Sequence, residues 1–471
     1  MIGSEIAKEL QLKLKPDKRH VSVDAQKSPA TLAILVACWI LNWSYTFVDL
    51  KQPKSRVKQI IEASRSSLLI SKEDNVDFVL SRSAELATLS RLGFSVSVED
   101  PGPYPFDDDT CYIMFTSGST GTPKGVPICS SQVLKLVDWL VGELGVEESD
   151  VLTSVNPWYF DNSVFDIYVS LLSGASLVLV DIDAHKSSLN WVDYLSAARP
   201  TVWFSVPSLI IFLQSMGVFK SNKFDSLRLI IFGGEAYPKE QLRLLLRDQG
   251  EKTKYRSVYG PTETTCICSV TEVNDVELES DALFVSLGNF ADFFNVGVSH
   301  TFKMENGEIA GELILGGSNV TQGYVNVSDD LDKFSLVAMS DGSVERYYRT
   351  GDLVSYNKEL KAFCFLGRKD NQVKRAGVRI ELEEIESRIE SSCGTICIVD
   401  FDVNRSSDLC LLFKSTQTID REKVISSCSS SLPHYMVPRA VFEVRDLPLN
   451  LNGKKDRKRA REVIVGLLGD D

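Results

Sequence analysis

Short apolar runs recur along the first half of the chain, and they constrain its fold more than any other feature. Each run has the length and the apolar composition of a buried strand. Four of them lie at 112–115 (YIMF), 177–180 (LVLV), 201–204 (TVWF) and 229–232 (LIIF). The segments 131–144 and 239–247, which follow such runs, have helical character. Strands that alternate with helices favour an α/β architecture with largely parallel sheets.

The character of the sequence changes twice after residue 278. Glycines first punctuate short strand-like runs, as in 311–324 (GELILGGSNVTQGY), which predicts a small β-rich subdomain. Near 367 a second change begins, and 378–389 (VRIELEEIESRI) has the apolar spacing of a helix. From residue 367 onward there are 18 basic and 17 acidic groups, so the negative excess lies earlier. We therefore predict a large N-terminal domain of βα subdomains over 1–367 and a smaller α+β domain over 368–471.

Composition and charge exclude several classes of protein. The 471 residues carry a net charge of −13, which disfavours a general attraction to nucleic acid. Ten cysteines are too sparse for a disulfide scaffold. The four histidines (His20, His185, His300 and His434) lie far apart in sequence, which disfavours a histidine metal site or a Ser/His/Asp triad. The chemistry is therefore expected to use other groups.

The N-terminal segment has no apolar core beside a cleavage site, so it does not predict a signal peptide. The most apolar stretch covers 30–41 and falls well short of the roughly 20 residues that span a bilayer. We expect a buried core helix there, no membrane association, and a cytoplasmic protein with reduced thiols.

A strand that runs into a glycine-rich loop is the most informative segment. Residues 112–126 read YIMFTSGSTGTPKGV. Small residues let backbone N–H groups approach an anion closely, the hydroxyls add donors, and a lysine adds the positive charge that a polyphosphate attracts. The loop lacks the Gly-Lys-Ser/Thr order of a Walker A motif. It predicts a phosphate-binding loop of another kind.

This loop resembles the signature phosphate loop of the adenylate-forming enzymes, and within them the adenylation domains of nonribosomal peptide synthesis. Further matching motifs follow in the family's order along almost the whole chain. They lie at 45–49 (YTFVD), 259–265 (YGPTETT), 311–313 (GEL) with 323–324 (GY), 348–353 (YRTGDL), 367–374 (GRKDNQVK), 432–438 (LPHYMVP) and 452–457 (NGKKDR). The stretches 160–174 and 201–208 also look like the D-alanine–carrier protein ligases.

The resemblance implies that a carboxylate attacks the α-phosphate of ATP and expels pyrophosphate. Both reactants are anions, so catalysis needs positioning and charge neutralisation rather than a general base. Lys454 is the implied transition-state cation, Thr262 and Thr116 would bind phosphate, and Glu263 would help to hold Mg²⁺. Asp352 would accept both ribose hydroxyls, and Tyr259 would stack near adenine. The implied ATP site comprises Thr116, Ser117, Gly118, Ser119, Thr120, Gly121, Lys124, Gly234, Glu235, Tyr259, Gly260, Asp352 and Arg368.

Asp161 resembles the family residue that pairs with the α-ammonium group of the substrate. A carboxylate between apolar neighbours is costly unless a cation compensates it, and an amino acid supplies one. The competing interpretation is that Asp161 caps a local helix. The pocket implied by the resemblance comprises Asn162, Phe165, Ser205, Ile231, Gly233, Val258, Cys266 and Ile267, together with Lys454. This mostly apolar lining favours a small or medium apolar amino acid, and D-alanine stays open.

Asp370 resembles the hinge about which the family's mobile C-terminal domain turns between two poses. One pose inserts Lys454 and the other opens a channel for a thiol. The chain departs from the family at 374–377 (KRAG), and it lacks the earliest family motif. No carrier domain follows residue 471, so we expect a separate carrier protein with a phosphopantetheine thiol. The basic segment 454–459 (KKDRKR) is a candidate docking side for it.

Two other functions stay open. An acyl- or aryl-coenzyme A ligase would share most motifs, but Asp161 argues against it because such substrates offer no cation. A catalytically silent relative that only binds ligands would have lost Lys454, Glu263 or the loop, and all are present.

Overall fold

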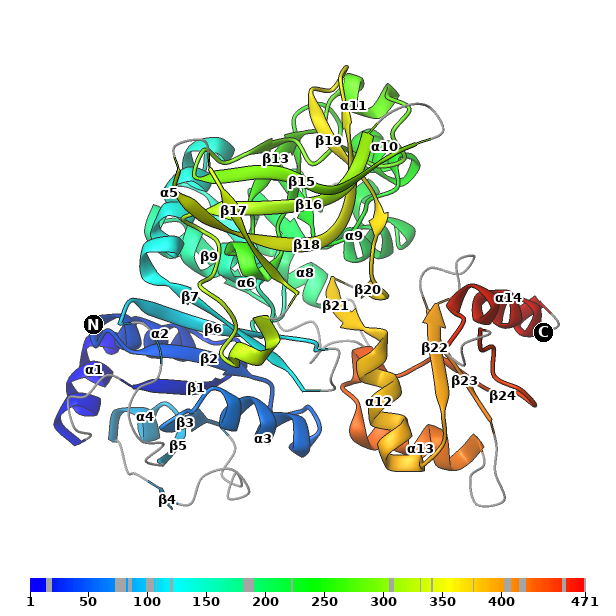
Figure 1. The fold of residues 1–471 in the computed structure, drawn as a ribbon. Coiled ribbons are helices and arrows are strands. Elements are labelled where there is room, and N and C mark those ends of the chain that lie inside the picture. Colours follow the sequence, from blue (N-terminus) through cyan, green and yellow to red (C-terminus); the bar gives the residue numbers. More distant parts are fainter. Residues whose placement is uncertain are drawn as a thin grey trace. The chain divides into compact units, whose positions relative to one another are not determined.

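The computed structural model describes residues 1–13, 19–72, 82–83, 87–98, 106, 108–118, 122–180, 190–221, 223–304, 309–330, 332–339, 342–375, 377–401, 408–414, 421–450 and 455–469. Its chain forms two compact units (Figure 1). The first comprises 1–49, 60–115 and 125–370, and the second comprises 50–59, 116–124 and 371–471.

The first sheet has seven strands in the order β4-β5-β3-β1-β2-β6-β7. Their bounds are β1 His20–Asp24, β2 Ser44–Val48, β3 Leu68–Ser71, β4 Arg82–Ser83, β5 Ser95–Val98, β6 Thr110–Thr116 and β7 Lys124–Cys129. The strands β3, β1, β2 and β6 run parallel, whereas β5 and β4 pair antiparallel at one edge. The helices of this part are α1 Ile2–Lys13, α2 Pro29–Ile40, α3 Lys54–Ala63 and α4 Ala87–Arg91.

The second sheet also has seven strands, in the order β14-β13-β12-β11-β10-β8-β9. Their bounds are β8 Val151–Ser154, β9 Ser176–Leu179, β10 Val202–Ser205, β11 Leu229–Gly233, β12 Lys254–Tyr259, β13 Ser269–Glu272 and β14 Asn289–Phe290. The strands β9, β8, β10, β11 and β12 run parallel to one another. Strand β13 is antiparallel to β12, and β14 is antiparallel to β13. The helices are α5 Ser130–Leu144, α6 Asn162–Val164, the π-helix η1 Phe165–Val169, α7 Ser170–Ser173, α8 Asn190–Ala197, α9 Pro207–Ser215, η3 Phe219–Ser221, α10 Lys239–Gln249, η4 Thr262–Thr264 and α11 Asp275–Glu279. The four predicted strands are confirmed as β6, β9, β10 and β11, and the two predicted helices as α5 and α10.

A third, antiparallel sheet follows, as the glycine-punctuated sequence predicts. Its strands are β15 Phe294–Lys303, β16 Ile309–Gly317, β17 Phe334–Ala338, β18 Val344–Asn357 and β19 Ala362–Arg368, with the short helix η5 Val327–Asp330. The segment 311–324 contributes only one strand, the end of β16. Together the three sheets confirm an α/β protein with mixed rather than wholly parallel sheets.

The second unit contains a hairpin, a three-stranded sheet and three longer helices. Its elements are β20 Gln372–Arg375, β21 Val378–Glu381, α12 Leu382–Cys393, β22 Cys397–Phe401, β23 Leu409–Phe413, α13 Arg421–Ser431, η6 His434–Met436, β24 Ala440–Glu443 and α14 Arg457–Gly469. The helix predicted over 378–389 is wrong in its first turn. Residues 378–381 instead form the strand β21, which pairs with β20. The side chains of Val378 and Ile380, at alternate positions of this strand, are buried.

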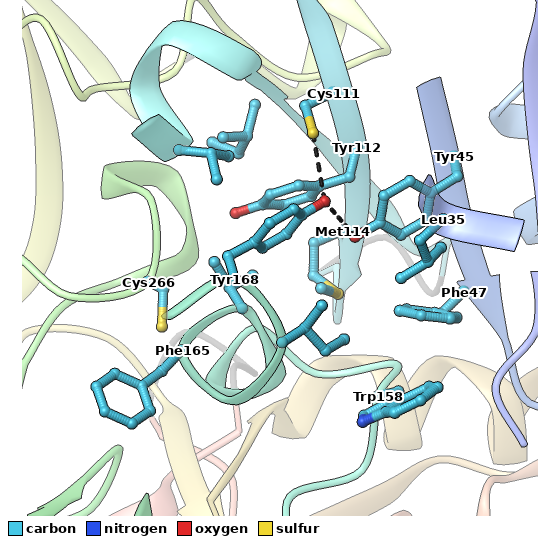
Figure 2. Close-up of a cluster of buried hydrophobic side chains, with 14 of the residues drawn as sticks. Leu35, Tyr45, Phe47, Cys111, Tyr112, Met114, Trp158, Phe165, Tyr168 and Cys266 are labelled. Atoms are coloured by element: carbon cyan, nitrogen blue, oxygen red, sulfur yellow. Dashed lines mark hydrogen bonds between the residues drawn. The ribbon is translucent and has the colours of Figure 1, made fainter. Parts of the chain in front are cut away.

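A core of aromatic side chains fixes the segment that carries Asp161. Figure 2 shows Tyr168 of η1 between Tyr45 and Cys111, while Phe165 points away from it. The hydroxyls of Tyr168 and Tyr45 lie 2.7 Å apart, and Cys111 Sγ lies 3.3 Å from the Tyr168 hydroxyl. The predicted core helix is confirmed as α2, whose inner face is buried. Within the described residues, no helix combines the length and the apolar character needed to cross a membrane.

Candidate active site

Asp161 reaches across the first unit instead of capping a helix. It precedes α6, but its side chain makes no capping hydrogen bond there. Thr262 Oγ1 of η4 donates to Asp161 Oδ2 over 2.5 Å, and the two residues lie 101 positions apart in sequence. The alternative of a local helix cap is therefore wrong. The carboxylate is half-buried and presented to the segment of the YGPTETT motif.

Three residues of the predicted pocket lie at the carboxyl ends of neighbouring parallel strands. Ser205 ends β10, Gly233 ends β11, and Val258 is next to the last residue of β12. Ligands of open α/β sheets bind at this edge. A Cβ on Gly233 would lie 2.5 Å from Val258 Cγ2 and from its carbonyl oxygen, so the glycine is required by the neighbouring strand.

The remaining pocket residues are mostly apolar and buried. Ile231, Phe165, Cys266 and Ile267 are each less than 5% exposed, whereas Asn162 is half-buried. The rings of Phe165 and Phe204 are 4.9 Å apart. Burial raises the pKa of the Cys266 thiol well above its ordinary value, and the charges of Asp161 and Asp166 add to the effect. The thiol is therefore neutral, and these side chains form an apolar surrounding.

Asp166 is a buried carboxylate to which sequence reasoning gave no role. It is fully buried, and Asn156 Nδ2 lies 3.3 Å from both of its oxygens. Burial raises the pKa of Asp166 to about 8, although the positive charge of Lys27 opposes this. The motif FDNSVFD contains both aspartates, but only the fold separates the half-buried Asp161 from the fully buried Asp166.

Glu263 is fully buried beside Thr262. Tyr324 Oη donates to Glu263 Oε1 over 2.6 Å, and Thr321 N donates to the Glu263 carbonyl over 2.8 Å. Tyr324 belongs to the GY motif, but its partner could not be read from the sequence. Within the described ranges no group of three His, Cys, Asp or Glu residues could hold a metal ion. A single carboxylate fits Mg²⁺ that takes most of its other ligands from phosphates and water.

The predicted ribose and adenine residues form one hydrogen-bonded cluster. Tyr259 Oη donates to Asp352 Oδ2 over 2.6 Å, and Arg368 Nη1 donates to Asp352 Oδ1 over 2.7 Å. Arg368 also makes two 2.7 Å bonds to the carboxylate of Asp370. Burial, followed by the charge of Asp352, raises the pKa of Tyr259 well above its ordinary value, so its hydroxyl stays a donor. Gly351 (φ +77°) leaves no space for a Cβ, which would lie 2.5 Å from Arg368 Nη2.

Three other predicted ATP-binding residues of the first unit, Glu235, Gly234 and Gly260, are not part of the hydrogen-bonded cluster around Asp352. Glu235 Oε2 accepts from Ser208 N at the start of α9 over 3.1 Å, which is a helix-capping contact. Gly234 has φ +84°. A Cβ on Gly260 would lie 2.2 Å from the Cys266 carbonyl oxygen, so only glycine fits there.

Part of the phosphate loop lies in the second unit, and part lies outside the described residues. Ser119, Thr120 and Gly121 belong to the latter part, and Lys454 of the motif at 452–457 also lies outside the described residues. Ser117 Oγ donates to the Arg379 carbonyl over 2.8 Å, and Gly118 N donates to Glu384 Oε2 over 3.2 Å. The loop therefore offers a backbone N–H that already holds an anionic oxygen. Thr116 is half-buried at the end of β6, and Lys124 is 8% exposed.

Two residues of the basic segment 454–459 form ion pairs within the second unit. Lys455 Nζ binds Glu386 over 2.8 Å and Glu390 over 2.7 Å. Arg457 binds Glu386 over 3.0 Å and Glu383 over 2.9 Å. Lys458 and Arg459, in contrast, are exposed. The predicted docking side therefore cannot include Lys455 unless these ion pairs break.

Comparison with known proteins finds relatives along almost the whole chain. The sequence profile described as "AMP-binding enzyme" matches residues 4–325. The chain is 30% identical to the D-alanine–D-alanyl carrier protein ligase of Bacillus licheniformis, covering 98% of this chain and 93% of that protein. It is 31% identical to bacitracin synthase 1 of the same species over 89% of this chain, but spans only 8% of that synthase. The adenylation domain AlmE of Vibrio cholerae, solved with glycyl-adenosine-5'-phosphate, superposes with a TM-score of 0.80 at 20% identity, covering 99% of this chain and 91% of that chain.

Proposed function

The chain belongs to the family of AMP-binding, adenylate-forming enzymes, and from this premise we propose that it activates an amino acid with ATP and loads it onto a carrier protein. The carboxylate of the amino acid attacks the α-phosphate, and the bond to pyrophosphate breaks. The phosphopantetheine thiol of a separate carrier then attacks the acyl carbon and releases AMP. The observation that carries this proposal is the placement of Asp161, which faces Thr262 rather than its own helix.

In this proposal the residues of the chain position two anions. Asp161 binds the ammonium group, Thr262 donates to a phosphate oxygen, and Asp352 accepts the ribose hydroxyls. Lys454 provides the positive charge in the transition state. Glu263 would hold Mg²⁺, which neutralises phosphate charge when bound. The oxygens of Asp352 accept from Tyr259 and Arg368 and keep further lone pairs, so the ribose hydroxyls would join or replace these donors.

The proposed substrate is a small or medium apolar amino acid. The buried walls at Phe165, Ile231 and Ile267 offer no partner to a charged side chain. The names of two relatives, a D-alanine ligase and a domain solved with a glycyl adenylate, support a small side chain. D-Alanine is the first candidate to be tested.

We further propose that the region from residue 368 forms a mobile C-terminal domain that turns about Asp370. The bidentate contact from Arg368 would fix this residue in one pose. Substitution of Asp370 by proline, which locks φ near −65°, should then slow one half-reaction more than the other. Equal effects on adenylation and thioester formation would contradict the hinge.

The test of the proposed function is ATP–pyrophosphate exchange with a panel of L- and D-amino acids and of simple carboxylic acids. We expect exchange with amino acids only, and about 10²- to 10³-fold less of it in Lys454→Ala, which loses one preorganised donor. Lys458→Ala, an exposed position on α14, is the matched control and should keep its rate. Exchange with simple carboxylic acids alone would favour an acyl-coenzyme A ligase, and no exchange would favour a silent relative.

A further inference from the structure

The hydrogen bond between Thr262 and Asp161 joins two residues to which the proposed reaction gives separate tasks. An ionised carboxylate can only accept, so the hydroxyl of Thr262 is the donor in this 2.5 Å contact. A threonine hydroxyl has a single hydrogen. While that hydrogen is directed at Asp161, Thr262 cannot donate it to a phosphate oxygen.

The surroundings of Asp161 favour a cation over this hydroxyl. Two of the side chains near Asp161 are the Cys266 thiol and the Tyr112 phenol, both buried and both influenced by the charge of Asp161. Burial raises the pKa of each well above its ordinary value, so both are neutral. The bond from Thr262 pairs the carboxylate with a neutral donor, whereas an ammonium group adds the attraction between two opposite charges, which is strong away from bulk water. An ammonium group with three donors is therefore a better partner for Asp161 than a neutral hydroxyl.

We propose that the ammonium group of the substrate displaces the Thr262 hydroxyl from Asp161 and thereby releases it to donate to a phosphate of ATP. This inference rests on the proposed function, which it deepens. Only hydrogen bonds are exchanged, since a serine or threonine hydroxyl rotates freely about its C–O bond. Recognition of the amine would thus prepare the phosphate site. An acid without an amine would leave Thr262 directed at Asp161.

The exchange predicts a coupling between two ligands. Because coupling is reciprocal, an amino acid should tighten nucleotide binding by the same factor by which the nucleotide tightens amino-acid binding. Removal of the hydroxyl has two opposite consequences. Thr262→Val should weaken nucleotide binding, but it should also tighten amino-acid binding without nucleotide, because the Thr262 hydroxyl no longer competes for Asp161. A residue that only contacts phosphate would not produce the second effect.

The experiment is titration calorimetry of the full chain with α,β-methylene-ATP and Mg²⁺, with D-alanine, and with propionate, which lacks only the amine. If another amino acid gives faster exchange, it and its des-amino acid replace the pair. In the parent we expect D-alanine to tighten nucleotide binding about 5- to 150-fold, the usual range of such coupling, and propionate to leave it unchanged. In Thr262→Val the coupling should fall to about 1, and Thr262→Ser should retain it.

Thr264→Val is the matched control because it removes a hydroxyl from the same helix η4. Thr264 Oγ1 donates its single hydrogen to the Pro261 carbonyl over 2.9 Å, not to Asp161. It should keep the parent's coupling. The inference is overturned if Thr262→Val couples the ligands as the parent does, or binds the amino acid no more tightly. If Thr262→Val does not fold, equal coupling by propionate and D-alanine in the parent overturns it. Failure of every amino acid to bind would instead overturn the proposed function.

Discussion

Two clusters of arginine and carboxylate side chains, one in each unit, look alike in chemistry but differ in what they connect. In the first unit Asp352 accepts from Arg368 over 2.7 Å and from Tyr259 over 2.6 Å. In the second unit Glu386 binds Arg457 over 3.0 Å and Lys455 over 2.8 Å. Both carboxylates are at most 5% exposed.

The two clusters differ in whether a backbone group donates to the carboxylate. Glu386 Oε1 also accepts from Val399 N of β22 over 2.8 Å, so its cluster connects α12 to the sheet and to α14. The donors to the Asp352 carboxylate are the side chains of Tyr259 and Arg368, and the hydroxyls of a ligand can replace them. We infer that the same ion pair can be structural or ligand-binding, depending on whether its partners are backbone groups or exchangeable side chains.

The largest expected effect is the loss of Arg457. Arg457→Gln leaves the buried Glu386 with one cation fewer, and breaking a buried pair costs about 3 kcal/mol or more of unfolding free energy. Chemical denaturation measures this loss. The neighbouring exposed residue provides the control, since Arg459→Gln should change stability by less than about 0.5 kcal/mol. Equal stabilities for the two variants would show that the cluster does not anchor α14.

The Asp352 cluster should respond in ligand binding more than in stability. Asp352→Asn removes a charged acceptor, and hydrogen bonds to charged groups are worth about 1.5–3 kcal/mol. We expect the KM for ATP to rise about 10- to 100-fold in pyrophosphate exchange. Against 3'-deoxy-ATP, the difference between parent and variant should shrink. If the variant loses as much with the deoxynucleotide as with ATP, Asp352 does not bind the ribose.

The loss of stability at low pH should arise at His20 of β1, which belongs to neither cluster. His20 is buried against Ser44, with Nδ1 2.8 Å from Oγ, and burial lowers its pKa from 6.5 to about 3. Between these values the unfolded chain binds the proton and the folded chain does not. The stability contributed by the neutral ring is therefore complete above pH 6.5 and is lost as the pH falls, by up to about 1.4 kcal/mol per pH unit.

Denaturation of the parent and of His20→Gln between pH 7 and pH 4 measures this effect. The variant should be less stable at pH 7 but lose less stability on acidification. Parallel pH profiles would place the acid-sensitive group elsewhere, including in one of the two clusters.

The smallest change in stability is expected from Lys458 and Arg459, two exposed residues of α14. Charge reversal at Lys458 and Arg459 should change the unfolding free energy by less than about 0.5 kcal/mol, because neither takes part in the Glu386 cluster by its side chain. If these residues guide an acidic carrier, loading should slow at low ionic strength and recover at high salt. Unchanged loading at low ionic strength would remove the basic segment from the proposed docking side.

Much of the fold could be predicted because buried strands carry their own apolar pattern, as β10 and β11 do. The segment 378–381 was misread because β-branched residues at alternate positions are also compatible with one face of a helix. Motifs identified Asp161 and Thr262 separately. Their contact could not be predicted, because it depends on two segments that only the tertiary structure brings together.

The π-helix at Phe165–Val169 makes the length of the chain a determinant of the direction in which Asp161 points. A π-turn contains an additional residue compared with an α-helical turn, and such insertions are common at functional sites. Tyr168 at its far end is held by Tyr45, so deleting one residue within the turn would rotate Asp161 by about 100° about the helix axis. A single-residue deletion that spares the proposed lining would thus turn the carboxylate of Asp161 away from Thr262 without any change in the chemistry of the side chains around it.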